Sequence, residues 1–178
     1  MSKKVQASID FIESLIDWVG KLVSWLTLMM VLVTTLIVIL RYLFDTGWVA
    51  MQESVLYMHA LVFMLGAAYT FKHNGHVRVD IFYQRCPVKT KAWIDLLGTL
   101  FLLIPFAVFI IWSSWEYVAS SWEIQESSRN SGGLPGVYLL KSCILIMATL
   151  LILQSIAGLL RNLLIITGSK GHPEIHHG

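Results

Sequence analysis

The stretch LVSWLTLMMVLVTTLIVIL, residues 22–40, contains no charged side chain. A helix rises about 1.5 Å per residue, so this stretch can cross a hydrocarbon layer of roughly 30 Å. Because lipid cannot satisfy free backbone N–H and C=O groups, a helix is expected here. Similar apolar stretches follow at residues 55–71, 96–115 and 142–160, without the alternation of a barrel strand. The sequence therefore predicts an all-α integral membrane protein with four transmembrane helices.

Composition also indicates that lipid is the natural solvent of this chain. Of its 178 residues, 56% are hydrophobic and 13% are charged, whereas about 25% of residues in soluble domains are charged. The net charge of +2 is too small to indicate a nucleic-acid partner. The spacing of Cys86 and Cys143 matches no zinc or redox motif, so two free thiols are expected.

The distribution of lysine and arginine predicts how the helices are oriented. One side of the membrane receives both termini and the loop between the second and third spans. It holds ten basic residues: Lys3, Lys4, Lys21, Lys72, Arg78, Arg85, Lys89, Lys91, Arg161 and Lys170. The other side holds three, namely Arg41, Arg129 and Lys141. Since cytoplasmic loops are enriched in positive charge, both termini are predicted to be cytoplasmic.

We expect a single membrane domain over residues 1–178. Its predicted parts are an amphipathic arm at 5–20, transmembrane helices at 22–41, 49–72, 93–116 and 138–162, and a flexible tail at 163–178. Asp10, Glu13 and Asp17 interrupt the apolar core that a signal peptide needs, so the chain is expected to be mature from Met1.

The arm has an apolar face and an acidic face. Val5, Ile9, Ile12, Ile16 and Val19 follow helical spacing, and Gln6, Asp10, Glu13 and Asp17 lie largely opposite them. This pattern is typical of a helix that lies along the membrane surface. Anionic lipids would not attract the acidic face, which therefore either binds a basic protein partner or is simply solvated.

Three polar residues lie in or beside the first two spans. Glu53 is one turn inside the outer end of the second span, and Arg41 ends the first span across a short loop. A carboxylate near hydrocarbon is costly unless it is paired or hydrated, so an ion pair or another polar contact is expected rather than a proton relay. His59 lacks the second histidine that a haem would need, and it is expected to be neutral and bonded to a neighbouring helix.

The most polar run between two spans is HNGHVRVDIF, residues 73–82. His73 and His76 could bind a metal only with further ligands, which the sequence does not place nearby. Apolar and polar residues then alternate, which indicates an extended turn. Arg78 and Asp80 are expected to attach this turn to the ends of the helices.

The outer loop WEIQESSRNSGGLPG, residues 122–136, ends in glycine and proline turn residues. Glu123, Glu126 and Arg129 are expected to be exposed on it, where contacts with other proteins commonly lie. The alternative is an ordinary solvated connection. The histidine-containing tail HPEIHHG is expected to be disordered.

Catalytic motifs are absent from the sequence. It contains no HExxH, phosphate-binding glycine loop or serine–histidine–aspartate arrangement, so neither an enzyme nor a cofactor is expected. Transporters that work alone usually carry repeats, broken helices and ionisable residues at the membrane midplane. Here only hydroxyls and the amide of Gln154 interrupt the middle of the first, third and fourth spans. These features favour an accessory subunit that packs against a larger protein.

Several segments resemble a known family, the DctQ-type small membrane subunit of tripartite ATP-independent periplasmic (TRAP) transporters. They are RYLFDTGWVAMQES at residues 41–54, GAAYTFKHNGHVRVD at 66–80 and ESSRNSGGLP at 126–135, followed by Lys141. HVRVD after an alanine-rich helix end is the most specific of them. The resemblance covers nearly the whole chain, including the order and spacing of the four spans.

The resemblance implies a role in a complex. Family members associate with a large DctM-type membrane subunit that carries the substrate, and a periplasmic binding protein delivers that substrate, usually an organic acid. Sodium import drives uptake, and the sodium and substrate sites belong to the large subunit. The small subunit is implied to stabilise the large one and to help dock the binding protein. The implied location is the bacterial inner membrane, and the implied amphipathic arm corresponds to residues 5–19. The candidates for contacts with partner subunits are Arg41, Glu53, Arg78, Asp80, Glu123, Glu126 and Arg129.

Two other functions stay open at this point. The first is a membrane anchor of a respiratory redox complex that binds haem or quinone, which a visible absorption spectrum would reveal. The second is a small transporter that works alone, which would take up solute without any partner.

Overall fold

The computed structural model describes residues 2–76 and 83–168, and every regular element in these ranges is helical. The elements are α1 (Ser2–Phe44), α2 (Val49–Lys72), α4 (Val88–Gly98), the π-helical turn η1 (Thr99–Leu103), α5 (Ile104–Glu123) and α6 (Val137–Ile166). Four segments within the described ranges are long and apolar enough to cross a membrane: Val5–Leu43, Val49–Lys72, Val88–Glu123 and Val137–Ile166. This agrees with the predicted all-α integral membrane protein.

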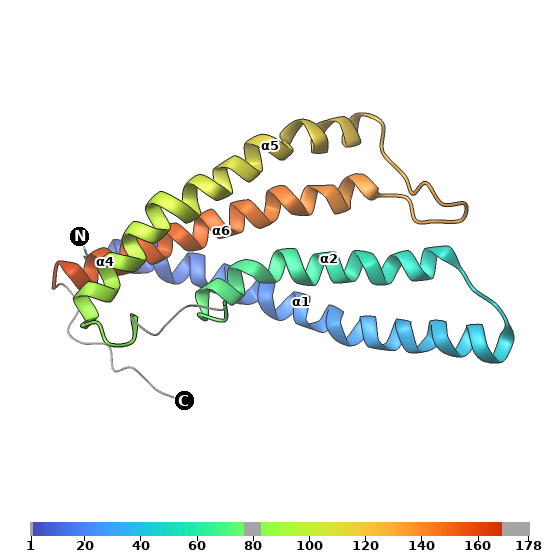
Figure 1. Ribbon diagram of the computed structural model, residues 1–178, viewed down its shortest axis with the longest axis horizontal. Helices are drawn as coiled ribbons and strands as arrows, with labels where there is room; N and C mark the ends of the chain where they lie inside the picture. The colour runs from blue at the N-terminus through green and yellow to red at the C-terminus, as the bar shows by residue number, and fades with distance from the viewer. Residues whose placement is uncertain (1, 77–82, 169–178) are drawn as a thin grey trace.

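The helices lie side by side along the long axis of the molecule (Figure 1). α1 and α2 form one hairpin, α5 and α6 form another, and α2 packs against α6 between them. We call the end where α2 and α6 finish and α4 begins the basic end. The opposite end, where α5 is connected to α6, is the loop end. α6 is the central helix, because 39% of its most apolar window is buried, compared with 6% for α1 and for α2.

α1 is one continuous helix, whereas the sequence predicts a boundary between an arm at 5–20 and a span at 22–41. The helix continues through Gly20 and Lys21, and no proline lies in it to remove a backbone hydrogen bond. Gly20 instead allows α1 to approach α2 closely. A Cβ atom at this position would lie 2.5 Å from Cγ of Tyr69 on α2. The position of the arm along the membrane surface stays a prediction.

The apolar face of the arm is buried inside the protein. Ile9 and Ile16 are each 1% exposed. Ile16 packs with Ala68 of α2 and Leu150 of α6, and Ile12, Val19, Leu65, Tyr69 and Leu151 surround them. Small residues elsewhere on α6, such as Ala148 and Ala157, are fully buried and allow neighbouring helices to approach closely. The three helices α1, α2 and α6 therefore share one core near the basic end.

The third span contains a π-helical turn before its proline. Pro105 has no backbone N–H and cannot complete the regular hydrogen-bond ladder of a helix. η1 lies directly before α5, in which Pro105 is the second residue. A single π turn is a common way to absorb such an interruption. Together, α4, η1 and α5 cover Val88–Glu123, which is longer than the predicted residues 93–116.

Gly20 provides a test of this packing. In Gly20→Ala, the new methyl group would overlap the Tyr69 ring close to its backbone, so α1 and α2 would have to separate. Overpacking of this kind costs about 1–3 kcal/mol. We expect a lower thermal unfolding temperature and a lower yield of folded protein in detergent.

Gly66→Ala is the matched control, because a Cβ atom at Gly66 of α2 has no heavy atom within 4 Å. This variant should unfold at the temperature of the parent or slightly above it. Equal loss of stability in the two variants would contradict the proposed contact between Gly20 and Tyr69.

Candidate functional site

A buried carboxylate near the start of α2 lies at the centre of the loop end. Glu53 is 7% exposed and accepts three hydrogen bonds from the loop that follows α5. Ser128 Oγ donates at 2.5 Å and Asn130 Nδ2 at 2.9 Å to Oε1, and the backbone N–H of Leu134 donates at 2.7 Å to Oε2. A buried carboxylate is costly unless it is satisfied in this way.

The loop forms a compact turn around this carboxylate. The Ser128 N–H donates to the Leu134 carbonyl at 3.2 Å, and the Gly133 N–H donates to the Asn130 carbonyl at 3.0 Å. A Cβ atom at Gly133 would lie 2.7 Å from Oε2 of Glu53. Only a glycine leaves space for the carboxylate here, which gives a physical reason for the sequence SSRNSGGLP.

A second carboxylate in the same loop is held by α5 and α6. Glu126 Oε2 accepts a hydrogen bond from Ser121 Oγ at 2.7 Å and pairs with the Lys141 ammonium group. The Lys141 ammonium also lies 3.9 Å from the centre of the Tyr117 ring. Lys141 and Ser121 hold the pKa of Glu126 below its ordinary range. The pair of Glu126 and Lys141 therefore stabilises the loop at pH values above the ordinary pKa of a glutamate. This contribution is lost as the pH falls through the lowered pKa of Glu126.

Aromatic residues connect the ends of α5 and α6. Trp122 Nε1 donates a hydrogen bond to Ser142 Oγ at 2.8 Å, and the Trp122 ring meets the Tyr138 ring edge-on at 4.7 Å between centres. With the two carboxylates, these contacts attach the loop to three helices, α2, α5 and α6.

The structure separates the predicted loop residues into two groups. Glu123 and Arg129 are exposed, as expected. Glu126 was also expected to be exposed, but it is half-buried, because Lys141 and Ser121 bind its carboxylate. Arg41 does not pair with Glu53, since the loop satisfies that carboxylate. Arg41 is exposed and forms no ion pair with any other residue that the structure describes.

The predictions for His59 and for the turn at residues 73–82 stand differently. His59 is exposed on α2 and its ring stacks on Phe63. It makes no hydrogen bond within residues 2–76 and 83–168, so the expected bond to another helix of this chain is wrong. Arg78 and Asp80 lie outside the described residues, and their attachment to helix ends stays a prediction.

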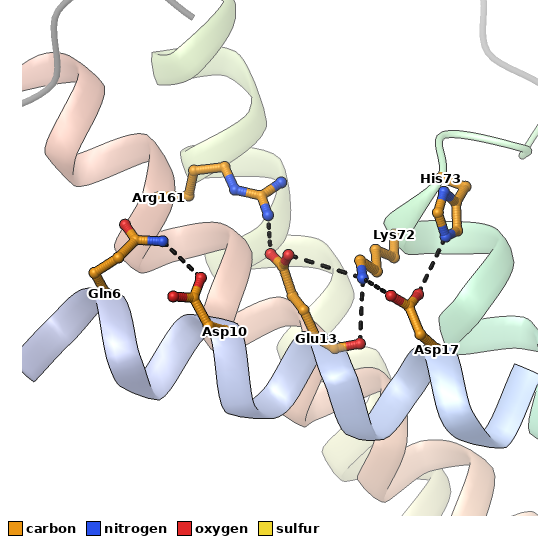
Figure 2. A network of polar contacts seen from close by, with 7 residues as sticks. All are labelled: Gln6, Asp10, Glu13, Asp17, Lys72, His73 and Arg161. Carbon is orange, nitrogen blue, oxygen red and sulfur yellow. Dashed lines mark hydrogen bonds and ion pairs between the residues drawn. The ribbon is translucent and has the colours of Figure 1, made fainter.

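A network of charged residues joins three helices at the basic end (Figure 2). Lys72 at the end of α2 lies 2.6 Å from Oδ2 of Asp17 and 3.8 Å from Oε2 of Glu13, both on α1. His73 Nε2 is 3.2 Å from the other oxygen of Asp17. Arg161 of α6 pairs with Glu13. The acidic face of the arm is thus used largely within the chain, and neither an external basic partner nor simple solvation describes Glu13 and Asp17.

The partners of both carboxylate sites were missed by sequence reasoning. Ser128 and Asn130 lie 75 and 77 residues after Glu53, and Lys72 lies 55 residues after Asp17. The Glu53 site could have been suggested by the outer loop, which is rich in glycines and in residues with short hydrogen-bonding side chains, together with a single acid in the neighbouring span. The site at the basic end could have been suggested by the acidic residues of the arm, together with the basic residues Lys72 and Arg161 near the ends of two other helices.

The Glu53 site yields a prediction about the loop. In Glu53→Ala, three donors lose their acceptor, and hydrogen bonds to a charged group contribute about 1.5–3 kcal/mol each. We expect proteases to cut residues 124–136 markedly faster, with little change in the helices measured by circular dichroism. Gly133→Ala should have a similar effect, because its methyl group would displace the carboxylate.

Arg129→Ala is the control for these two variants, because Arg129 is exposed on the same loop. It should be cut at the rate of the parent once the loss of the basic cleavage site is allowed for. A loop that stays protected in Glu53→Ala would show that the carboxylate does not hold it.

Comparison with known proteins identifies the family. Residues 30–164 match the family described as tripartite ATP-independent periplasmic transporters, DctQ component. The C4-dicarboxylate TRAP transporter small permease protein DctQ of Vibrio cholerae serotype O1 is 27% identical over 79 residues, which are 44% of this chain and 34% of that relative. The chain thus covers about a third of that relative's length, and no solved structure matches it. Because the family match includes most of the chain, the protein belongs to the DctQ family, the small membrane subunits of TRAP transporters.

Proposed function

We propose that this chain stabilises the large DctM-type membrane subunit of a sodium-coupled importer of organic acids and helps to dock the periplasmic substrate-binding protein. Membership of the DctQ family makes the chain a small permease subunit of a TRAP transporter. The relative from Vibrio cholerae carries C4-dicarboxylate in its name, which supports an organic acid as the class of substrate.

One observation carries the supporting role. Glu53 is the only buried charged side chain among the described residues, and the protein's own loop satisfies it. A path for an anionic solute and sodium needs polar or ionisable groups near the membrane midplane. Among the described residues, the ionisable side chain in the middle of a span is His59, which lies exposed on the surface of α2, and the interruption at η1 contains Thr99 followed by apolar residues. We therefore place the substrate and sodium sites in the large subunit.

The orientation follows from charge. With both termini in the cytoplasm, the loop end faces the periplasm of a bacterial inner membrane. Glu123 and Arg129 then point into the compartment where the binding protein acts. Since the loop is attached to three helices, these two charges lie on a rigid surface, which favours a specific contact.

The exposed face of α2 is the proposed contact with the large subunit. Gln52, Leu56, His59 and Phe63 recur at helical spacing, and all four are exposed. A polar ring in the middle of a span is costly against lipid, but it can be satisfied by a hydrogen bond to another transmembrane helix. The redox-anchor alternative gains no support from His59, because none of the other spans contains a histidine.

Charge reversal tests the docking surface. In Glu123→Lys and Arg129→Glu, the helices and the Glu53 site are left intact, so the complex should assemble normally. Rim charges act mainly on association, and we expect uptake at limiting binding-protein concentration to fall several-fold and to depend less on salt.

Lys89→Glu is the matched control, because it reverses an exposed charge at the opposite, basic end. It should leave the dependence of uptake on binding-protein concentration unchanged. Normal uptake by both loop variants would remove the docking role and leave the stabilising role untouched.

Substitution of His59 tests the contact with the large subunit. Interhelical hydrogen bonds in membranes contribute about 0.6 kcal/mol on average, which is roughly a threefold change in affinity. We expect His59→Leu to lower co-purification of the large subunit by about this factor. Leu32→Ala on α1 changes another exposed position in a span and should have no effect. Unchanged co-purification in His59→Leu would exclude this face.

A further inference from the structure

The outer half of α5 carries a row of polar side chains on one exposed face. Ser113, Glu116, Ser120 and Glu123 are all exposed, and with Phe109 they recur at alternating intervals of four and three residues. In a helix of about 3.6 residues per turn, this spacing places them along one side. We call Ser113, Glu116 and Ser120 the α5 stripe.

The α5 stripe points away from the rest of the protein. The buried residues of α5 are Ala107, Val118 and Ser121, and helical spacing places them on the side of α5 opposite Glu116. α5 is at the edge of the molecule, and α6 is the helix beside it (Figure 1). Within residues 2–76 and 83–168, Glu116 makes no hydrogen bond or ion pair.

Glu116 lies deeper than the level at which the neighbouring helix becomes charge-free. It directly follows the apolar stretch 96–115, but α5 continues beside α6 as far as Glu123. Trp122 Nε1 donates a hydrogen bond to Ser142 Oγ, where the charge-free part of α6 begins. Glu116 is six residues before Trp122, which corresponds to about 9 Å along the helix. A carboxylate at this depth is costly unless it is paired or hydrated.

The α5 stripe offers hydrogen-bond acceptors to a partner. The Ser113 hydroxyl donates to the Ile110 carbonyl at 3.3 Å, and the Ser120 hydroxyl donates to the Tyr117 carbonyl at 3.3 Å. The lone pairs of both hydroxyls are thus available, as are those of the Glu116 carboxylate. A lysine ammonium has three N–H donors and an arginine guanidinium has five. A basic side chain therefore matches the stripe in charge and in hydrogen bonding.

Large aromatic side chains border the α5 stripe. Trp112 and Trp115 are 77% and 60% exposed, and together with Val108, Ser113 and Glu116 they line an open hollow. Small residues such as serine allow transmembrane helices to approach closely, and tryptophan is enriched among the residues that dominate protein contacts. These features favour a helix of another protein over lipid tails, which offer no donor to Glu116 or to the deeper Ser113.

We propose that the α5 stripe binds a transmembrane helix of the large subunit, and that a lysine or arginine of that helix pairs with Glu116. The inference rests on the proposed function, because the partner is the large subunit, and it adds a second contact face to the one on α2. α2 and α5 lie on either side of α6 (Figure 1), so a protein with several helices can reach both faces.

A second copy of this chain matches Glu116 less well. Near the loop end, Lys141 is already paired with Glu126, and Arg129 lies on the loop rather than in a span. Arg41, at the outer end of α1, is the exposed cation that a second copy would have to use. Self-association is therefore an outcome that the experiment must distinguish.

Neutralisation of Glu116 tests the proposal. Glu116→Gln keeps the shape of the side chain and removes its charge. In the isolated chain no contact is lost, so the thermal unfolding temperature should stay the same or rise. In the complex, the cation of the partner loses its carboxylate. We expect the dissociation constant of the two subunits, measured by energy transfer between labelled subunits in lipid vesicles, to rise by about tenfold.

Glu123→Gln is the matched control, because it makes the same change in the last residue of the same helix. It should bind the large subunit as tightly as the parent. A parent chain that does not bind the large subunit would contradict both the proposed function and this inference. A parent and Glu116→Gln that bind equally well would overturn this inference alone.

A photocrosslinker in place of Ser120 identifies what covers the α5 stripe. We expect it to react with a helix of the large subunit that contains a lysine or arginine. Glu116→Lys should weaken binding further, and reversal of that partner cation to glutamate should restore it. Crosslinks to lipid alone, or to a second copy of this chain, would overturn the proposal.

Discussion

A charge at the edge of a membrane must be paired or hydrated, and the charges that are paired here hold the helices together at both ends. At the loop end, Glu53 is satisfied by Ser128, Asn130 and the Leu134 backbone, which attaches the connection between α5 and α6 to α2. At the basic end, α1 provides the acidic groups and α2 and α6 provide Lys72 and Arg161. Between the two ends, small residues such as Ala68 and Ala157 allow close packing without polar groups.

This distribution of charge agrees with the proposed supporting role. Its buried carboxylate and its ion pairs are used to join its own helices, and the outer surfaces of α1 and α5 are largely apolar. Such surfaces can be covered by lipid or by another membrane subunit. Glu123 and Arg129 do not join helices of this chain. Their charges are exposed, next to or within a loop that is fixed by its contacts with three helices.

The sequence was sufficient to predict the four spans, because a run such as residues 22–40 has only one stable solution in lipid. It was not sufficient to predict that the arm and first span form one helix, since amphipathic and apolar segments can be joined with or without a bend. Glu53 was correctly expected to need a polar contact. Its partners could not be identified, because Ser128 is brought to it only by the packing of α2 beside α6. Glu126 was misjudged for the same reason, as Lys141 approaches it only when the loop folds back.

The central claim is that this chain supports transport but moves no solute itself. The most direct measurement compares sodium-driven uptake of a labelled organic acid by proteoliposomes that contain the chain alone with uptake by liposomes that contain it with the large subunit and the binding protein. We predict uptake only in the complete system. Accumulation of the labelled acid by vesicles that contain the chain alone would contradict the account.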